Sequence, residues 1–476
     1  MLVRMNAFDI GRLDAHAQAS LLHSGAITPL QLTEAAITRI EHLNPTLNVL
    51  TVRCYELARA RAAAVTANRE RTLAGVPYLL KDSLDYPGLP TRSGSRLRAA
   101  AGPARGEHEY SRRLDAEGLI PLGKSNVPEF CLLPTTESLL SGAARNPWSL
   151  EHSPGGSSGG AAVAVASGMV PLAHAADGGG SIRIPASCCG LLGLKPGRGG
   201  NVRARAQHIV EDLLVGDTLL SRTVRDAAWA FSVMQPDAAG KPGVDLAAPA
   251  RRLRIAVVEH NLFGDVPHPH VAQGLRQTAD LCANLGHEVV QARLPFDTAS
   301  VARGFQVIWA YLALDLVEHC RGTLINESPG NESLGALLEP WTLNLAHWGR
   351  QFEAADLDTA LRQVALATAA LDEFQRDHPV ILSPTLKHPP LPLGRLAPTQ
   401  PFDALCSDMF DYVSYTPLHN LTGAPAISVP LFMSPEGLPI GSMFAAARGG
   451  EATLLQLARQ LEQAAPWAER WPPYSI

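Results

Sequence analysis

Residues 154–196 read PGGSSGGAAVAVASGMVPLAHAADGGGSIRIPASCCGLLGLKP and contain two serine–glycine clusters separated by a segment of small residues. The clusters are GGSSGG at 155–160 and GGGS at 178–181. Glycine at this density lets the backbone adopt positive φ or approach a neighbour so closely that a Cβ would collide. Successive glycine N–H groups can also converge on an anion. A serine beside such donors suits acyl transfer, which needs a nucleophile and donors for the oxyanion it creates.

Short strands and helices alternate around these clusters, which predicts an α/β domain. We expect helices over 159–168 and from residue 181 onward, with strands over 170–175 and 190–194. Further upstream, a short apolar strand within GVPYLLKD ends at Lys81. Because lysine is rarely buried unless it is paired or functional, Lys81 is a candidate catalytic residue. The alternative is a surface lysine whose amine reaches water.

The amino-acid composition excludes several classes of protein. The 476 residues are 46% hydrophobic and 18% charged, with a formal net charge of -5, so nothing indicates a nucleic-acid or anionic-membrane partner. The N-terminus lacks the apolar segment of a signal peptide, and no apolar run is long enough for a membrane span, so we expect a cytoplasmic protein. The seven cysteines lack zinc-ligand spacing. We therefore expect free thiols and no metal site, with Cys188 and Cys189 as small core residues.

The whole chain, residues 1–476, is expected to form a single domain in three recognisable parts. Residues 1–75 are predicted to be helical, including a third helical run over 47–67. Residues 76–235 are the expected catalytic core. Residues 305–376 form an expected helical insert beside the substrate pocket.

One motif in the core is misleading. GLIPLGKS at 118–125 matches the phosphate-binding pattern GxxxxGK[ST]. That motif needs a strand before the first glycine and a polar loop between the glycines. Here the intervening residues are apolar and form the strand themselves. We therefore predict a strand followed by a turn, and no nucleotide site.

GGSSG at 155–159 also fits G-x-S-x-G, the nucleophile elbow of α/β-hydrolases. An elbow requires an acidic residue and then a histidine later in the chain. His378, His388 and His419 are available, but none has a distinctive context. In a glycine- and serine-rich loop, a chance match to so short a motif is common.

Motifs along nearly the whole chain, together with the two clusters, resemble the amidase signature family. They are GVPYLLKD at 75–82, LGKSNVPEF at 122–130, NPW at 146–148, SRTVRD at 221–226, LTGAPA at 421–426 and LPIG at 438–441. The tryptophan-bearing helical part and the ending LEQAAPW at 461–467 are similar to stand-alone bacterial amidases of the 6-aminohexanoate cyclic-dimer hydrolase type.

The resemblance implies an α/β domain with a large mixed β-sheet core surrounded by helices, and a Ser–Ser–Lys triad. By position, Ser181 is the nucleophile, Ser157 is the bridging serine that follows a cis peptide bond, and Lys81 is the base. Ser181 would pass its proton to Ser157 while Ser157 passes its own proton to a neutral Lys81. Burial can lower a lysine pKa from about 10.4 far enough for this role.

Other residues are assigned by the same resemblance. The oxyanion hole is expected from the backbone N–H groups of Gly178, Gly179, Gly180 and Ser181. The supporting residues are expected to be Ser158, Asp177 and Arg183, with the last two as an ion pair. We expect no cofactor and no metal.

The chain departs from the family pattern at two glycines. Gly178 stands where many members have threonine or isoleucine, which removes a side chain beside the acyl site. We therefore expect a wider site or a more mobile oxyanion hole. Gly197 replaces the usual threonine after Lys-Pro, which leaves the conformation of the following loop open.

The favoured interpretation is hydrolysis of a small, uncharged aryl or alkyl amide, with carbamate (urethane) cleavage as a chemically adjacent activity. The pocket is expected from the loops at 197–210, 309–320 and 338–348, with Trp309 and Trp341 as candidate substrate contacts. Arg203 and Arg205, in the first of these loops, weaken the case for an uncharged substrate.

Two other classes of function stay open. The first is the amidase subunit of a tRNA-dependent amidotransferase, which needs a partner and a route for ammonia. No docking patch is evident, and the helical part is similar to stand-alone enzymes. The second is a catalytically silent binding protein, which an intact triad disfavours. We expect no nucleic-acid or membrane partner, and a monomer or homodimer.

Overall fold

The structure is a computed structural model that describes residues 6–65, 71–205, 209–237, 243–247, 251–327 and 334–476. The strands are β1 (Leu50–Arg53), β2 (Pro77–Lys81), β3 (Ile120–Ser125), β4 (Glu137–Ser138), β5 (Gly142–Ala143), β6 (Leu172–Asp177), β7 (Gly193–Lys195), β8 (Gly216–Leu220), β9 (Arg254–Val257), β10 (Glu288–Gln291), β11 (Val380–Pro384), β12 (Ala426–Met433) and β13 (Pro439–Ala446). The α-helices are α1 (Ala7–Gly11), α2 (Ala15–His23), α3 (Pro29–Leu47), α4 (Tyr55–Ala64), α5 (Glu109–Ala116), α6 (Gly159–Ala166), α7 (Arg183–Cys189), α8 (Ile209–Leu214), α9 (Val224–Met234), α10 (Pro269–Asn284), α11 (Thr298–Glu327), α12 (Leu334–Leu337), α13 (Pro340–Gly349), α14 (Ala354–Asp377), α15 (Phe402–Tyr412), α16 (Pro417–Leu421) and α17 (Glu451–Ala464). Short 3-10 turns lie at η1 (Arg96–Arg98) and η2 (Glu129–Cys131).

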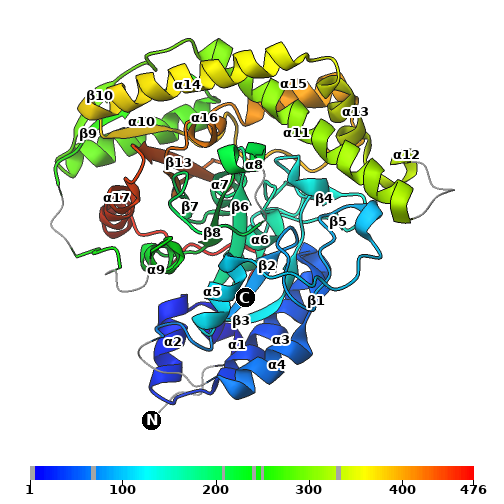
Figure 1. Cartoon of the computed structure of the whole chain (residues 1–476). Helices are drawn as coiled ribbons and strands as arrows, with labels where there is room; N and C mark the ends of the chain where they lie inside the picture. The colour runs from blue at the N-terminus through cyan, green and yellow to red at the C-terminus, as the bar shows by residue number, and fades with distance from the viewer. Residues whose placement is uncertain (1–5, 66–70, 206–208, 238–242, 248–250, 328–333) are drawn as a thin grey trace.

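Two mixed β-sheets form the centre of the molecule, and helices surround them (Figure 1). The first sheet has the strand order β1-β3-β2-β6-β8, and the second has the order β10-β9-β11-β13-β12-β7. An antiparallel bridge between Leu192 and Ser221 connects the segments beside β7 and β8. The predicted α/β class, with mixed sheets surrounded by helices, is confirmed. We expected one large sheet, but the structure has two sheets, and this isolated bridge links them.

The three parallel strands of the first sheet, β3, β2 and β6, end close to the two serine clusters. Strand β2 pairs in parallel with β3 on one side and with β6 on the other. Parallel strands present their carboxyl ends at one edge, where α/β proteins place their ligand sites. Lys81 and Asp177, the last residues of β2 and β6, therefore lie at the same edge. Strand β3 includes the apolar residues of the GLIPLGKS motif, so the prediction of a strand there is confirmed.

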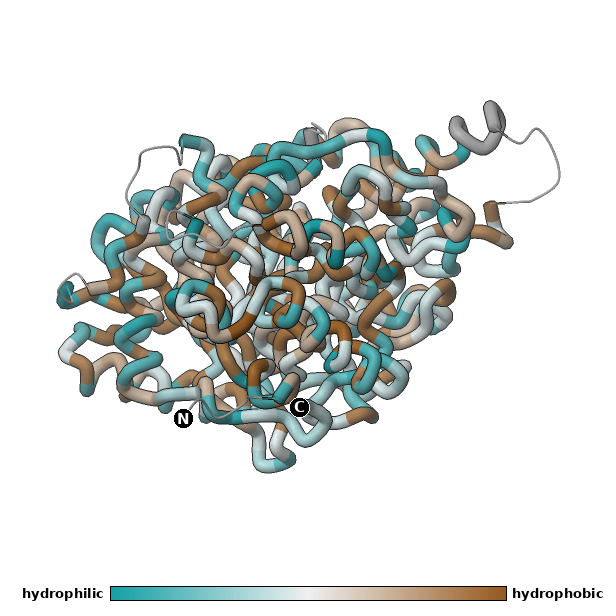
Figure 2. Tube along the Cα trace, turned by 90° about the horizontal axis from the view of Figure 1, so that it is seen from below, coloured by the Kyte–Doolittle hydropathy of each residue, from teal (hydrophilic) through white to brown (hydrophobic). Residues whose placement is uncertain are grey.

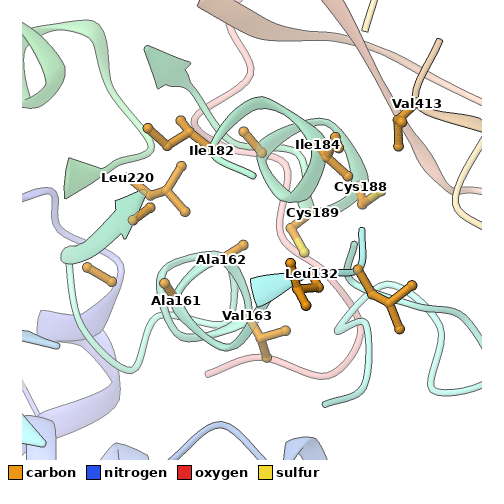
Figure 3. Packing of buried hydrophobic residues seen from close by; sticks show 14 of the residues in the cluster. Leu132, Ala161, Ala162, Val163, Ile182, Ile184, Cys188, Cys189, Leu220 and Val413 are labelled. Carbon is orange, nitrogen blue, oxygen red and sulfur yellow. The ribbon is translucent and has the colours of Figure 1, made fainter. Parts of the chain in front are cut away.

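Helices α6 and α7, which follow the two serine clusters, pack against each other between the sheets. Helix α6 contacts β2, β3 and β6, whereas α7 contacts β7, β12 and β13. Their side chains are small: Ala161 and Ala162 of α6 share a core with Cys188 and Cys189 of α7 (Figure 3). Both cysteines are fully buried free thiols, as predicted. Small residues let the two helices approach closely and bring the two clusters together.

A layer of helices covers the other side of the site. Helix α11 packs on α13 and α14, and the three arch over the sheets (Figure 1). The described residues of the predicted helical segment 305–376 are mainly helical, and residues 328–333 of that prediction lie outside the described residues. Hydrophilic and hydrophobic residues are interspersed along the chain trace (Figure 2). Within the described residues, one segment, Thr298–Arg321 of α11, has the length and apolar character of a membrane span, but 56% of its most apolar stretch is buried inside the protein.

The N-terminal part contains a strand that we did not predict. Helix α3 begins with a capping box between Thr28 and Gln31, continues through Pro45 and ends at Asn48, which is left-handed (φ 53°). The chain then forms β1, which pairs antiparallel with β3, before α4 begins. The predicted helix over 47–67 is therefore wrong at β1. Pairing with the sheet edge outweighs local helical preference there.

Candidate active site

Lys81 lies at the end of β2 with its amine turned toward the first serine cluster. It is 1% exposed, and its Nζ lies 2.8 Å from Ser157 Oγ and 3.1 Å from the carbonyl oxygen of Ala176. Burial lowers the pKa of Lys81, because an ammonium loses its hydration there. A neutral amine can donate to Ala176 and direct its lone pair at the Ser157 hydroxyl. This geometry suits a base.

The loop that carries Ser157 packs against another backbone segment. The Gly156–Ser157 peptide bond is cis. A Cβ on Gly156 would lie 2.3 Å from the carbonyl oxygen of Thr135, so only glycine fits at this position. Ser158 Oγ donates to the carbonyl oxygen of Ala176 and accepts from its N–H, each at 3.3 Å. Ser158 therefore holds the loop to the end of β6, the holding role predicted for it.

A cavity of about 170 Å³ brings the three candidate triad residues together. Lys81, Ser157 and Ser181 all line it, and Ser181 is 8% exposed. A smaller void of about 20 Å³ with an apolar lining adjoins Ser181 on another side. Ser181 thus lines both the cavity and the void, which also share Cys131, Leu132 and Trp309.

The glycines before Ser181 differ in the use of their N–H groups. The N–H of Gly180 donates to Asp177 Oδ1 at 2.6 Å, so this candidate oxyanion donor is already engaged. Among the residues that the structure describes, the N–H groups of Gly178, Gly179 and Ser181 have no hydrogen-bond acceptor. These three groups are the ones left to receive an oxyanion. Gly180 has φ 140° and instead allows the close turn.

Asp177 and Arg183 form the predicted ion pair. Both are fully buried, with Arg183 Nε 2.9 Å from Asp177 Oδ2. The N–H of Ile182, just before the start of α7, also donates to this carboxylate. Burial opposes ionisation of Asp177, but the charge and hydrogen bonds of Arg183 outweigh it and hold the Asp177 pKa below its usual range. The pair therefore fixes the start of α7 and the loop that carries Ser181.

The sequence analysis missed two partners of this pair from far along the chain. Asn420 donates to Asp177 Oδ1 at 2.8 Å and accepts from Arg183 Nη2 at 2.6 Å. Thr416 Oγ1 donates to the carbonyl oxygen of Gly179 at 2.6 Å. No periodic pattern in the sequence marks these two residues, although the LTGAPA motif begins directly after Asn420.

The family assignment follows from comparison with known proteins. The family model for amidases matches residues 31–455. The chain belongs to the amidase signature family. It is 37% identical over 99% of both chains to the protein named "Putative amidase AmiC" of Mycobacterium tuberculosis strain H37Rv. It is 34% identical over 96% of both chains to 6-aminohexanoate-cyclic-dimer hydrolase of Pseudomonas sp. strain NK87. The solved structure of a 6-aminohexanoate cyclic dimer hydrolase superposes with a TM-score of 0.88 at 31% identity, covering 98% of this chain and 99% of that one.

The two tryptophans predicted to contact substrate in this amidase differ in position. Trp309 of α11 lines both the cavity and the smaller void. Trp341 of α13 is 2% exposed and is not one of the residues that line either space. Both indole N–H groups donate to the carbonyl oxygen of Leu132 at 3.3 Å. Trp341 therefore supports the wall behind Leu132, which does line the cavity.

Of the two arginines considered in the loop at 197–210, Arg203 and Arg205, one lies in the wall of the cavity. Arg205 lines the cavity, whereas Arg203 forms an ion pair with Asp212 and is 44% exposed. His174 and Asp217 also line the cavity and contact each other, with His174 Nε2 3.3 Å from Asp217 Oδ1. Neither His174 nor Asp217 was predicted as a site residue. A histidine within a buried strand next to the GGGS cluster was the available signal.

Cys131 is a further residue of the amidase cavity that the sequence analysis did not select. It lines the cavity together with Lys81, and its backbone has left-handed φ 62°. The histidines considered for a nucleophile elbow lie elsewhere. His378 stacks on Phe374, and neither it, His388 nor His419 is among the residues lining the Ser181 cavity. The described residues contain no cluster that could hold a metal ion.

Proposed function

We propose that this chain hydrolyses the carbon–nitrogen bond of a small, uncharged aryl or alkyl amide through an acyl-enzyme on Ser181. The observation that carries the proposal is the 2.8 Å contact between Lys81 Nζ and Ser157 Oγ in a cavity that Ser181 also lines. The relative named for the cyclic dimer of 6-aminohexanoate supports an aliphatic amide. We further propose that the enzyme acts in the cytoplasm without a partner subunit.

Acylation begins with proton removal from Ser181. Its Oγ attacks the carbonyl carbon while its proton passes to Ser157 Oγ, and the proton of Ser157 passes to the Lys81 amine. The negative charge that develops on the carbonyl oxygen is received by the N–H groups of Gly178, Gly179 and Ser181. Each such donor contributes roughly 3 to 4 kcal/mol in comparable sites.

Collapse of the intermediate breaks the carbon–nitrogen bond. The proton on Lys81 returns through Ser157 to the leaving nitrogen, so a neutral amine departs and an ester remains on Ser181. Water then attacks the ester carbon and gives its proton along the same route to Lys81. The ester bond breaks, Ser181 regains a proton, and the carboxylic acid leaves.

The cavity lining supports an uncharged or weakly polar substrate near Ser181. Its apolar side is made by Phe130, Leu132, Val215, Trp309 and Leu312. A carbamate presents the same carbonyl to Ser181, and loss of its amine leaves an alkoxycarbonyl ester. We therefore propose carbamates as a second substrate class within the same mechanism.

The test is hydrolysis of a substrate panel by the purified chain alone. The panel contains a p-nitroanilide, a primary aryl amide, a linear and a cyclic aminohexanoate oligomer, and an aryl carbamate. We expect turnover by the wild type and loss of turnover in Ser181→Ala. Ser20→Ala, on the exposed surface of α2, is the matched control and should behave as wild type.

The ranking of substrates gives the substrate class. Equal turnover by Ser181→Ala and wild type would refute the acyl-enzyme. A folded wild type that hydrolyses nothing in the panel, yet gains activity when a partner subunit is supplied, would favour the amidotransferase interpretation.

A further inference from the structure

A chain of three polar side chains forms one wall of the catalytic cavity and has no part in the triad. Arg205 Nη1 lies 2.5 Å from Asp217 Oδ2, and His174 Nε2 lies 3.3 Å from Asp217 Oδ1. Asp217 is 3% exposed and His174 is 1% exposed. All three residues line the cavity that contains Lys81, Ser157 and Ser181.

Asp217 lies next to the residue that holds the Lys81 amine. Strand β8 pairs antiparallel with β6, and Asp217 is directly opposite Ala176, whose carbonyl oxygen lies 3.1 Å from Lys81 Nζ. The carboxylate of Asp217 acts electrostatically on Lys81 and favours the ammonium form. A buried, unpaired carboxylate at this position would therefore work against a lysine that has to be neutral.

Arg205 supplies the compensating charge. Burial opposes ionisation of Asp217, but Arg205 and His174 lower its pKa to about 2, so the carboxylate stays charged over the working range. Burial lowers the pKa of His174, which leaves a neutral imidazole donating from Nε2 to Asp217. Its Nδ1 is buried and has no hydrogen-bond partner among the described residues. Arg205 is thus the cation that pairs with Asp217.

The other charged and titratable groups around Lys81 do not take this role. Asp177 also acts on Lys81, but it is paired with Arg183. Cys131 lines the same cavity as Lys81 and is a free thiol. Tyr110 lies beside His174, with ring centroids 5.0 Å apart, and burial raises its pKa far above neutrality. Asp217 is therefore the carboxylate near Lys81 that is paired with an arginine in the cavity wall, namely Arg205.

We propose that Arg205 is a positioning residue that keeps the charge of Asp217 paired, so that Lys81 stays neutral and can accept the proton relayed from Ser181. Two nitrogens of the Arg205 guanidinium form hydrogen bonds within the protein, whereas its buried Nε faces a carboxylate without a hydrogen bond. Its Nη1 binds Asp217, its Nη2 donates to the carbonyl oxygen of Val215 at 2.7 Å, and its Nε lies 3.5 Å from Glu211 Oε2. The inference rests on the proposed role of Lys81 as the base.

The test measures how fast Ser181 is labelled by an alkyl fluorophosphonate as a function of pH. The probe reports nucleophilicity without a known substrate, because Ser181 Oγ bonds to phosphorus and fluoride leaves. The rate should rise with pH as Lys81 loses its proton. In Arg205→Gln, Asp217 stabilises the ammonium, so we expect the midpoint to move upward by about one pH unit. Arg205→Lys keeps the charge and should leave the midpoint close to wild type.

Variants of Asp217 distinguish an electrostatic role of Arg205 from a merely structural one. Asp217→Asn removes the carboxylate, so its midpoint should move downward, opposite to that of Arg205→Gln. The double variant Arg205→Gln/Asp217→Asn has no unpaired charge and should return toward wild type. A merely structural role would lower the rate at every pH and leave the midpoint in place, which would overturn the inference. Shifts of the two single variants in the same direction would overturn it as well.

If the proposed roles of Ser181 and Lys81 are wrong, the labelling experiment gives results that differ from those expected when only the role of Arg205 is wrong. If Ser181 is not the nucleophile, wild type and Ser181→Ala will be labelled alike. If Lys81 is not the base, Lys81→Met will keep the wild-type pH profile. A wild type that depends on both residues, with Arg205 variants whose midpoint does not move, refutes only the role of Arg205.

Discussion

At the scale of single residues, the protonation of the Lys81 amine sets the pH range in which we expect activity. Only a neutral amine accepts a proton, so activity is lost as pH falls through the Lys81 pKa. Burial lowers this pKa from 10.5. We therefore expect kcat/KM for a p-nitroanilide to rise with pH and to level off below pH 10.5. Lys81→Met should lower kcat by about 100- to 10,000-fold, the usual contribution of a general base. A wild-type profile with its midpoint at or above pH 10.5 would contradict a depressed lysine pKa.

Gly178 controls the width of the acyl site. A Cβ built on it would lie 3.3 Å from Val215 Cγ2 and 3.7 Å from Trp309 Cζ3, both on the cavity wall. Gly178→Thr should fill this space and lower kcat/KM for a bulky acyl group by about 10-fold relative to an acetyl group. Kinetics on paired acetyl and branched-acyl anilides measure the ratio. An unchanged ratio would show that bulky acyl groups lie elsewhere.

Gly180 is the contrasting position in the same loop. Its φ of 140° is strained for any other residue, and a Cβ would lie 2.4 Å from Thr416 Oγ1. Gly180→Ala should lose activity toward large and small substrates alike and should destabilise the fold on the order of 1–3 kcal/mol. Urea unfolding followed by circular dichroism measures the loss. Wild-type stability in this variant would mean that the loop has another conformation available.

At the scale of elements, α7 depends on its buried ion pair. Asp177→Asn keeps the shape of the side chain but leaves Arg183 as an unpaired buried cation. We expect a loss of about 3–5 kcal/mol in the free energy of unfolding, because breaking one partner of a buried pair strands the other charge. The exposed pair of Arg376 and Glu373 on α14 is the matched control. Arg376→Ala should change stability by no more than about 0.5 kcal/mol. Equal losses in both variants would remove the special role of Asp177.

The sequence predicted helices and strands well where the local residue pattern favours the same structure as the tertiary contacts. Strand β2 and helix α6 lie close to their predicted ranges because an apolar run marks the strand and a run of small helix-forming residues marks the helix. Strand β1 was missed because only its pairing with β3, about 70 residues away, makes it a strand. Likewise the glycines and serines of the site were visible as motifs. Asn420, Thr416 and Asp217 were not, since their roles arise from contacts that the fold creates.

At the scale of the whole molecule, the helical cover and the catalytic core share one hydrophobic cluster. Val163 of α6 and Ile184 of α7 belong to the same cluster as Ile308 of α11, Leu345 of α13 and Val364 of α14. The segment 305–376 is therefore packed into the core that supports the triad, and its removal would expose that core. A cover that was only an accessory layer would have a core of its own.

We accordingly expect the cover and the site to unfold together. Native-state hydrogen exchange at increasing urea should give the amides of α11 and α14 the same opening free energy as those of α6 and α7. Loss of fluorophosphonate labelling at Ser181 should follow the same urea dependence. The matched comparison is α2, which belongs to a different hydrophobic cluster and is free to open at another urea concentration. If α11 and α14 exchange at lower urea while Ser181 is still labelled, the cover is a separate unit and the site stands without it.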